Sequence, residues 1–356
     1  MSDFTTSLIR VQASSDMLPE TMVTIKDVAR AAGVSVGTVS NVLSKLPTVA
    51  EDLRKRVEEA IEELNYQPSY VARSLKSKQT KTLAIVISDI TNPFFPMIVR
   101  GAEDAAAERG YMLSIFNTDD DLDKERMVLE NLGSRRVDGL LLVPALCKGS
   151  VRHIQKLIEH DVPVVCLDRT PDGLEVDCVA VDNAGGVASC IAHFAGQGAR
   201  RIVFLGGTAG QHIAPERLEG YRQGMKAAGL PIDPQLIWEG DFRQDSGYKL
   251  GRERMPVVKP DAVFVANIRM TMGFLKAMRE LRIDTPRDYL FATFDYLPIL
   301  DAFQPAMTCV SQPSYEIGRC GANALIDRIQ RIRTGEPVRK VLPTGLVMGE
   351  TSTRKS

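Results

Sequence analysis

Apolar positions near the start of the chain follow a helical period. Between Thr24 and Gly33 they share one face of a helix: Ile25, Val28, Ala29 and Ala32. Thr24 and Asp27 have the spacing of a capping box, and glycine commonly ends a helix. Similar patterns predict a second helix from Ser35 to Leu43 and a third over residues 50–64. We therefore expect a small domain of three helices within residues 23–67.

From Thr82 the pattern changes to short apolar runs separated by longer amphipathic stretches, which is typical of parallel strands joined by helices. The rhythm restarts after residue 182, so two similar halves follow one another. We predict a multi-domain chain, with an N-terminal all-α helix-turn-helix and an α/β core of two doubly wound parallel-sheet lobes. The expected strands are Leu83–Ile87, Met112–Phe116, Gly139–Val143, Val162–Leu167, Arg201–Leu205, Leu236–Glu239, Ala262–Ala266 and Tyr289–Thr293.

Composition narrows the class of protein. The chain has 356 residues, of which 44% are hydrophobic and 25% charged, and its net charge of −1 argues against a protein that coats nucleic acid non-specifically. Its six cysteines lack metal-ligand spacing, so we expect neither a metal ion nor a cofactor. The sequence has no long apolar run, and its first twenty residues lack the basic segment followed by an apolar segment that marks a secretion signal. We therefore expect a cytoplasmic protein without a membrane partner.

An enzyme is the first rival interpretation, because doubly wound lobes also occur in dehydrogenases and kinases. The sequence lacks GxGxxG and GxxxxGK[ST], and its four histidines have no evident nucleophile partner. We expect no catalysis.

A helix, a glycine turn and a second helix that opens with small polar residues indicate a helix-turn-helix. The residues that would reach base edges in the major groove are Ser35, Val36, Gly37, Thr38, Ser40 and Asn41. The turn alone is equally compatible with a packing role, because other small three-helix domains contain one.

Three motifs closely resemble the lactose-repressor (LacI/GalR) family: TIKDVARAAGVSVGTVSNVL from Thr24, LNYQP from Leu64 and VARSL from Val71. Later runs, at residues 89–95, 181–183, 217–221 and 312–318, extend the resemblance over nearly all of the chain after residue 23. It implies a homodimer that reads a near-palindromic operator in double-stranded DNA, with a periplasmic-binding-protein-like core. It also implies a hinge helix that forms on DNA. Further implied DNA contacts are Thr24, Tyr66, Val71, Ala72, Arg73 and Leu75, the last as a minor-groove wedge.

On this basis we divide the chain into five parts. Residues 1–22 form a disordered extension, residues 23–67 the helix-turn-helix domain, and residues 68–81 the hinge helix and linker. Residues 82–182 with 312–340 form one lobe of the effector domain, and residues 183–311 with 341–356 form the other. In the second helix of the DNA-binding domain, Val36 and Gly37 offer no hydrogen-bonding side-chain group. We therefore expect base specificity from Thr38, Ser40 and Asn41, with Val36 against a thymine methyl.

Polar residues follow several of the expected strands, where ligands of open α/β sheets bind. Each is individually more typical of a turn or cap, but the resemblance implies an effector-binding arginine at Arg217 and hydroxyl acceptors at Asp295 and Asn267. It also implies that Phe242 packs against a ligand ring. The full expected set is Asn92, Phe94, Asp168, Arg217, Phe242, Asn267, Arg269 and Asp295. The single tryptophan, Trp238, is expected near the same cleft.

Arg269 departs from the family pattern, which commonly has an acid in that loop. Arginine in the first turn of a helix is disfavoured by the helix dipole, so it needs an anionic partner. That partner is either a neighbouring carboxylate or an anionic effector, such as a sugar acid or sugar phosphate. We expect a repressor that a sugar-type effector releases from DNA. A corepressor-activated repressor and a global carbon regulator controlled by a phosphocarrier protein remain open alternatives.

Overall fold

The structure is a computed structural model that describes residues 23–66, 79–135, 137–145, 147–169, 173–210, 213–302 and 304–354. These residues fall into two units, divided after Lys78. The expected extension at residues 1–22 and the expected hinge contacts Val71, Ala72, Arg73 and Leu75 lie outside the described residues. No helix in the described part of the chain is long and apolar enough to cross a membrane.

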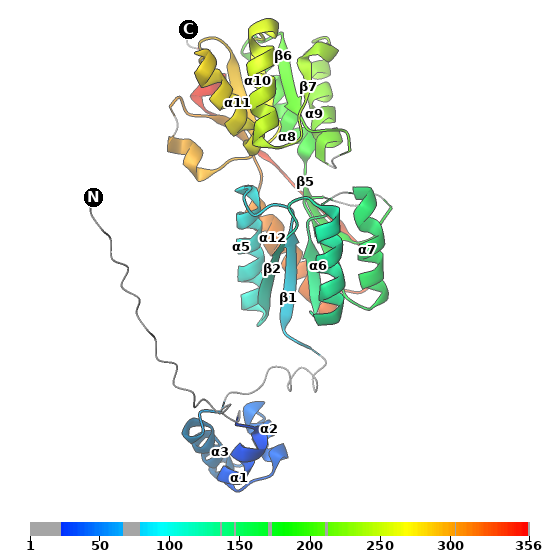
Figure 1. Ribbon diagram of the computed structural model, residues 1–356, viewed down its shortest axis with the longest axis vertical. Coiled ribbons are helices and arrows are strands. Elements are labelled where there is room, and N and C mark those ends of the chain that lie inside the picture. Colours follow the sequence, from blue (N-terminus) through cyan, green and yellow to red (C-terminus); the bar gives the residue numbers. More distant parts are fainter. Residues whose placement is uncertain are drawn as a thin grey trace, which may run out of the picture. The chain divides into compact units, whose positions relative to one another are not determined.

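Within residues 23–66, the N-terminal unit contains three helices, as the sequence predicts (Figure 1): α1 (Ile25–Ala32), α2 (Val36–Leu43) and α3 (Glu51–Glu63). The Asp27 carboxylate accepts hydrogen bonds from the Thr24 backbone N–H and hydroxyl, at 3.0 and 2.6 Å, so the expected cap of α1 is present. Gly33 ends α1 in the left-handed region, with φ 62°. The buried side chains of Val28, Val39 and Val57 join the three helices in one small core.

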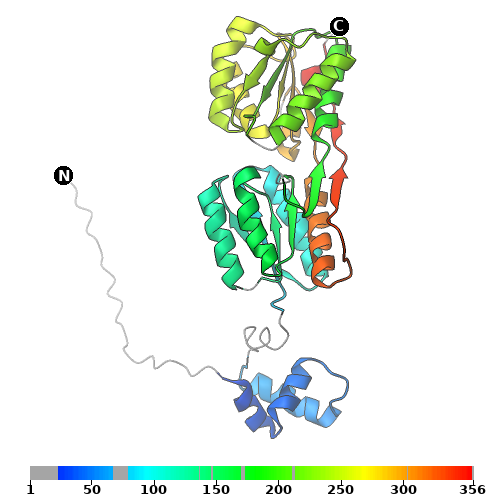
Figure 2. The ribbon, with the colours of Figure 1, turned by 90° about the vertical axis from the view of Figure 1, so that its right-hand side faces the viewer.

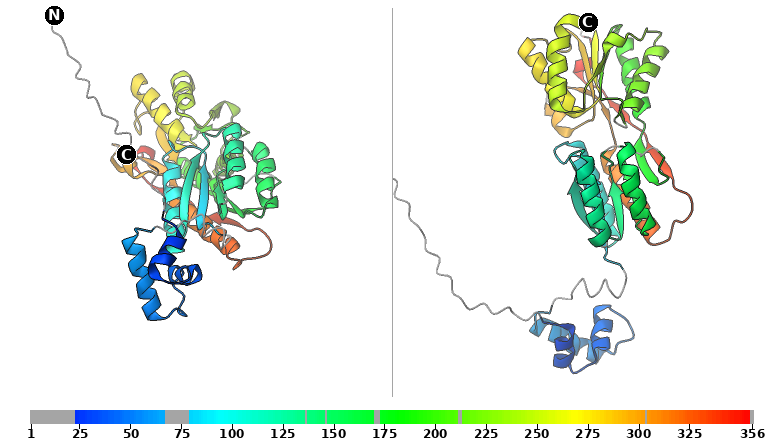
Figure 3. Two further views of the ribbon diagram at one scale, coloured as in Figure 1. Left: turned by 60° about the horizontal axis from the view of Figure 1, so that its bottom comes forward. Right: turned by 45° about the vertical axis from the view of Figure 1, so that its right-hand side comes forward.

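The second unit contains two six-stranded sheets, each with helices on both faces (Figure 3). The sheet of the N-lobe has the strand order β11-β5-β4-β3-β1-β2 and is parallel throughout. Its strands are β1 (Thr82–Ile87), β2 (Met112–Asn117), β3 (Gly139–Leu142), β4 (Val164–Leu167), β5 (Asp177–Val181) and β11 (Arg339–Leu342). Its helices are α5 (Phe94–Glu108), α6 (Leu122–Arg135), α7 (Cys147–Glu159) and α12 (Ser314–Ile329).

The sheet of the C-lobe has the order β12-β10-β9-β8-β6-β7, and only the pairing of β10 with β12 is antiparallel. Its strands are β6 (Ile202–Gly206), β7 (Ile237–Glu239), β8 (Ala262–Val265), β9 (Leu290–Phe294), β10 (Thr308–Ser311) and β12 (Gly345–Val347). Its helices are α8 (Asn183–Gly196), α9 (Ile213–Ala227), α10 (Gln244–Val258) and α11 (Ile268–Leu281). Three short 3-10 helices, η1 (Pro234–Leu236), η2 (Pro298–Ala302) and η3 (Glu350–Ser352), complete it.

The chain passes between the lobes three times, after β5, after β10 and after β11. Figure 2 shows β5 and β11 side by side at the last strand pair of the N-lobe sheet. The division expected after residue 340 is two residues early, because Val341 and Leu342 pair with β5 in the N-lobe. Thr80 and Lys81, assigned to the linker, belong to the second unit, where their backbone N–H groups donate to the Asp138 carboxylate.

The helices α5 and α12 cross very closely on one face of the N-lobe sheet. A side chain at Gly101 would put its Cβ 1.9 Å from the carbonyl oxygen of Tyr315, and one at Gly318 would lie 1.8 Å from that of Ile98. Glycine on each helix therefore permits backbone contact. This crossing fixes the segment after β10 within the N-lobe.

Candidate functional site

The first turn of α2 is the exposed end of the helix-turn-helix. The Ser35 hydroxyl oxygen accepts from the Thr38 backbone N–H at 3.1 Å and lies 3.0 Å from the Thr38 hydroxyl. Val36 and Gly37 are exposed, Val36 to 41%, while Val39 and Val42 of the same helix are buried. The buried face holds α2 against α1 and α3, and the opposite face is available to a partner.

The other DNA-contacting residues expected in this unit are distributed unevenly. Thr24 is exposed, and Ser40 and Asn41 are partly exposed on α2. Tyr66 is partly buried and packs against the small core. Arg56 stabilises the turn between α1 and α2, because its guanidinium donates to the carbonyl oxygens of Ala32 and Gly33 at 2.5 and 3.3 Å.

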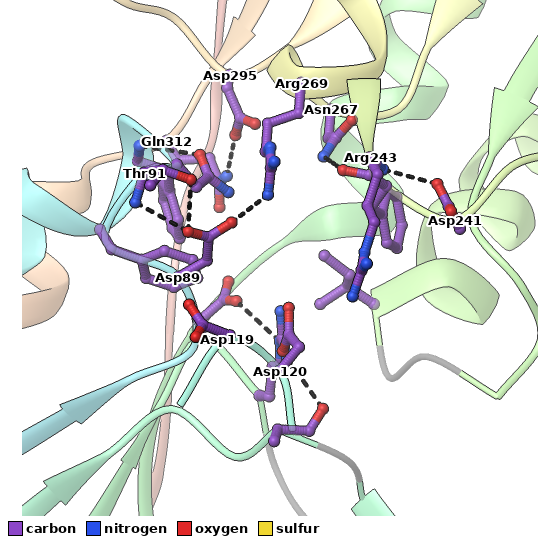
Figure 4. Close-up of a pocket in the computed structure, with 18 of the residues that line it drawn as sticks. Asp89, Thr91, Asp119, Asp120, Asp241, Arg243, Asn267, Arg269, Asp295 and Gln312 are labelled. Carbon is purple, nitrogen blue, oxygen red and sulfur yellow. Dashed lines mark hydrogen bonds and ion pairs between the residues drawn. The ribbon is translucent and has the colours of Figure 1, made fainter. Parts of the chain in front are cut away.

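A cavity of about 360 Å³ lies between the carboxyl ends of the two sheets in the second unit. Figure 4 shows its polar lining. Residues from both lobes contribute, and all eight of the expected effector contacts are among them: Asn92, Phe94, Asp168, Arg217, Phe242, Asn267, Arg269 and Asp295. The structure thus brings together side chains that the sequence spreads over about two hundred positions, as expected for the ends of parallel strands.

Asp168 directly follows β4, has a left-handed φ of 63° and is 4% exposed. Its Oδ1 has no hydrogen-bond partner among the described residues. Burial raises the pKa of its carboxyl group to about 6, against the opposing charges of Arg169 and Arg217. A buried acceptor without a partner costs free energy, so this oxygen favours a ligand that donates a hydrogen bond.

Gln312 lies beside Asp295 and provides a second such acceptor. Its side-chain amide N–H donates to Asp295, while its Oε1 is buried and unpartnered among the described residues. Asp295 also accepts from the Ile268 backbone N–H at 3.2 Å. The Asn267 amide is engaged at both ends, because Oδ1 caps α11 at Met270 and Nδ2 donates to the carbonyl oxygen of Phe242, each at 2.9 Å. These contacts fix the loops of the C-lobe around the cavity.

Arg217 lies in the second turn of α9, which begins at Ile213. The side chain is 2% exposed, and its guanidinium lies 3.6 Å from the centre of the Phe294 ring. It donates to Asn183 Oδ1 at 2.9 Å and to the carbonyl oxygen of Ala266. Burial lowers the pKa of this guanidinium, while the Asp295 and Asp168 carboxylates oppose the shift.

Arg269 forms an ion pair with Asp89, which lies just after β1 in the other lobe (Figure 4). Of the two partners considered from the sequence, the neighbouring carboxylate is the one that the structure contains. Asp89 also accepts from the Thr91 backbone N–H and hydroxyl, at 2.9 and 2.6 Å, which holds its carboxylate in place.

Trp238 does not line the cavity. The side chain is fully buried in the core of the C-lobe, where its indole N–H donates to the carbonyl oxygen of Gln235 at 3.0 Å. Other lining residues were missed, among them Asp119, Asp120, Arg243 and Gln312. The two aspartates follow the expected strand at residues 112–116, so the rule used for the other strand ends would have found them. Gln312 follows β10, which was not predicted.

Comparison with known proteins gives two family matches. Residues 24–69 match the model described as bacterial regulatory proteins, lacI family, and residues 191–352 match the periplasmic binding protein-like domain. The ribose operon repressor of Escherichia coli (strain K12) is 37% identical over 311 residues, which are 86% of this chain and 93% of the relative. The repressor PurR of Photobacterium profundum is 33% identical over 312 residues, covering 87% of this chain and 92% of the relative.

A solved structure, the transcriptional regulator CelR in complex with cellobiose, is also similar. It has a TM-score of 0.70 and 33% identity, and the match covers 92% of this chain and 99% of that one. These findings confirm the predicted fold class, with an N-terminal helix-turn-helix and two parallel-sheet lobes. Both relatives are named as repressors. The chain therefore belongs to the lacI family of bacterial regulatory proteins, whose members bind DNA and respond to small-molecule effectors.

Proposed function

We propose that this regulator is a homodimeric repressor of a near-palindromic operator, and that a small polyhydroxylated effector in the cavity releases it from DNA. The observation that carries the effector class is the pair of buried acceptors, Asp168 Oδ1 and Gln312 Oε1. Carboxylate and amide oxygens without partners suit a ligand with several hydroxyl groups, because each hydroxyl can donate one hydrogen bond. A cavity of about 360 Å³ is within the range of small-molecule sites.

Aromatic side chains complete the complementarity to a sugar. Phe94 and Phe242 line the same cavity, and the C–H face of a sugar ring is apolar. The similar regulator whose structure contains cellobiose, and the relative named for the ribose operon, support a sugar or sugar derivative for this chain as well. We therefore propose that the eight expected residues form the effector site.

At the DNA, α2 would lie in the major groove. The exposed Val36 would contact a thymine methyl, and Thr38, Ser40 and Asn41 would reach base edges. Two copies of the chain present two such helices, so the operator would consist of two inverted half-sites.

The effector acts by linkage between the cavity and the DNA. Because the cavity is lined from both lobes, a ligand there favours one arrangement of the lobes over another. We propose that this arrangement decides how the two N-lobes of the dimer meet and whether the hinge helices form. The coupling free energy expected for such a device is about 1–3 kcal/mol.

Selection of binding sites from random duplex DNA with the full chain tests the proposal. We expect enrichment of one near-palindromic sequence, bound by two protein chains per duplex, with retention that falls as salt rises. Static light scattering of the free protein would establish whether it is a dimer. A selected site without inverted symmetry, or one chain per duplex, would contradict the homodimer. Failure to enrich any sequence would contradict operator binding.

A further inference from the structure

Four arginines line the cavity, and three of them are engaged by the protein. Arg169 pairs with Asp120 at 2.6 Å, Arg217 donates to Asn183 and a backbone carbonyl, and Arg269 pairs with Asp89. Each of these guanidinium groups therefore already has a hydrogen-bond partner in the protein, and for Arg169 and Arg269 that partner is a carboxylate.

The fourth, Arg243, differs from them. The residue immediately precedes α10. Its backbone N–H donates to Asp241 Oδ1 at 2.8 Å, and this hydrogen bond holds the backbone of Arg243 in position. Within the described ranges its guanidinium makes no hydrogen bond or ion pair. Figure 4 shows the side chain at the cavity beside Asn267. The position also places its charge at the positive end of a helix of 15 residues.

The carboxylates around the cavity do not neutralise this charge by contact. Asp119 is held by Lys124 and Asn117, whose hydrogen bonds do most to lower the pKa of its carboxyl group, while the charge of Arg243 lowers that pKa less. Asp89 and Asp120 are paired with other arginines. Among the described residues, Arg243 is thus a cation without a direct partner, in the same cavity as a buried carboxylate oxygen, Asp168 Oδ1, that also has none there.

We infer that the effector carries an anionic group as well as hydroxyl groups. A phosphate or carboxylate would bind the Arg243 guanidinium, and the hydroxyls would donate to Asp168 and Gln312 in the interior of the cavity. Arginine suits both anions, since its planar donors match two oxygens at once. This inference rests on the proposed function, because it concerns the ligand of the same cavity, and it assigns the anion to Arg243 and not to Arg269.

Calorimetric titration of the full chain tests it with matched pairs of probes. Pentose and hexose phosphates, and the corresponding aldonic and uronic acids, are each compared with the neutral parent sugar. We expect one anionic probe to bind about tenfold or more tightly than its parent, because charge-assisted hydrogen bonds are the stronger ones. Arg243→Gln should remove most of that preference, and Arg243→Lys should retain part of it. The phosphate and carboxylate arms identify which anion is recognised.

The matched control is Lys249→Gln, which removes an exposed positive charge from the same helix without touching the cavity. Its probe affinities should equal those of the wild type. Equal or tighter binding of a neutral parent, an unchanged preference in Arg243→Gln, or binding of no anionic probe would each overturn the inference. A neutral sugar that binds and changes operator affinity would overturn this inference alone. Ligands that bind without any effect on operator affinity would instead overturn the proposed function.

Discussion

Arg269 and Asp89 join the two lobes across the effector cavity. Asp89 follows β1 of the N-lobe and Arg269 lies in the first turn of α11 in the C-lobe, so their ion pair is a direct bond between the lobes. An arginine at the positive end of a helix is unfavourable by itself, and the carboxylate offsets that cost. Both residues line the cavity.

A double-mutant cycle measures this bond. We expect Asp89→Asn and Arg269→Gln each to lower the free energy of unfolding, with a coupling of about 1 kcal/mol, because both side chains are more than two thirds buried. Urea denaturation of the four proteins gives the value. The matched cycle at Arg252 and Glu280, a more exposed pair within the C-lobe, should give a smaller coupling. Additive effects at Asp89 and Arg269 would show that the bond contributes nothing.

Asp168 should make stability depend on pH. Its pKa is about 6 in the folded protein against an ordinary value of 3.8, so the folded state holds the proton more tightly. The stability from this protonation is present below about pH 4 and is lost as the pH rises through 6. Asp168→Asn should not lose stability over this pH range. Its free energy of unfolding should therefore exceed that of the wild type by on the order of 3 kcal/mol at pH 7.

Thermal unfolding at several pH values checks this expectation. Asp245→Asn, which changes an exposed side chain on α10, is the control and should follow the wild-type profile. Parallel profiles of Asp168→Asn and the wild type between pH 4 and 7 would refute the assignment.

Gly33 should be required for the stability of the DNA-binding unit. Its φ of 62° favours glycine, and a Cβ there would lie 2.6 Å from the Arg56 guanidinium nitrogen that caps α1. We expect Gly33→Ala to cost about 1–2 kcal/mol. Hydrogen exchange over residues 23–66 measures the loss. Gly37→Ala is the control, because its Cβ would meet only the Ser35 hydroxyl at 3.5 Å, an ordinary contact. Equal protection from hydrogen exchange in Gly33→Ala and Gly37→Ala would contradict the proposed requirement for glycine at the end of α1.

Asn41 should contribute to base specificity. Binding-site selection with Asn41→Ala should lose preference at one position of each half-site, since a bidentate amide contact is worth about 1–3 kcal/mol of discrimination. Val36→Ala should weaken a preference for thymine. An Asn41→Ala protein that selects the wild-type sequence at every position would exclude the amide from base reading.

Several strands could be predicted from their apolar residues alone. Strands such as β1 and β8 are continuous apolar runs, and their periodicity is clear. β11 was missed because it is mostly exposed and contains Arg339 and Lys340, so nothing in its composition separates it from a loop. Its pairing with β5 also moved the lobe boundary by two residues.

The candidate site was predictable where strand ends converge, as at Asp168 and Asp295. Which polar atoms remain free was not predictable, because that depends on contacts between distant segments. The pairing of Arg269 with Asp89, for example, joins residues 180 positions apart. The prediction that Trp238 lies near the cavity was wrong. Although Trp238 is close to Phe242 in the sequence, its side chain points from β7 into the core of the C-lobe.

The proposed mechanism requires that ligand binding in the cavity is linked to operator binding. The most direct test is the affinity of the wild-type protein for its selected duplex, with and without saturating ligand. Fluorescence anisotropy at a fixed salt concentration measures this affinity. The account predicts that a ligand bound in the cavity weakens duplex binding by about 5-fold to 150-fold, and that the duplex weakens ligand binding by the same factor. A ligand that raises the unfolding temperature through the cavity but leaves the duplex affinity unchanged would contradict it.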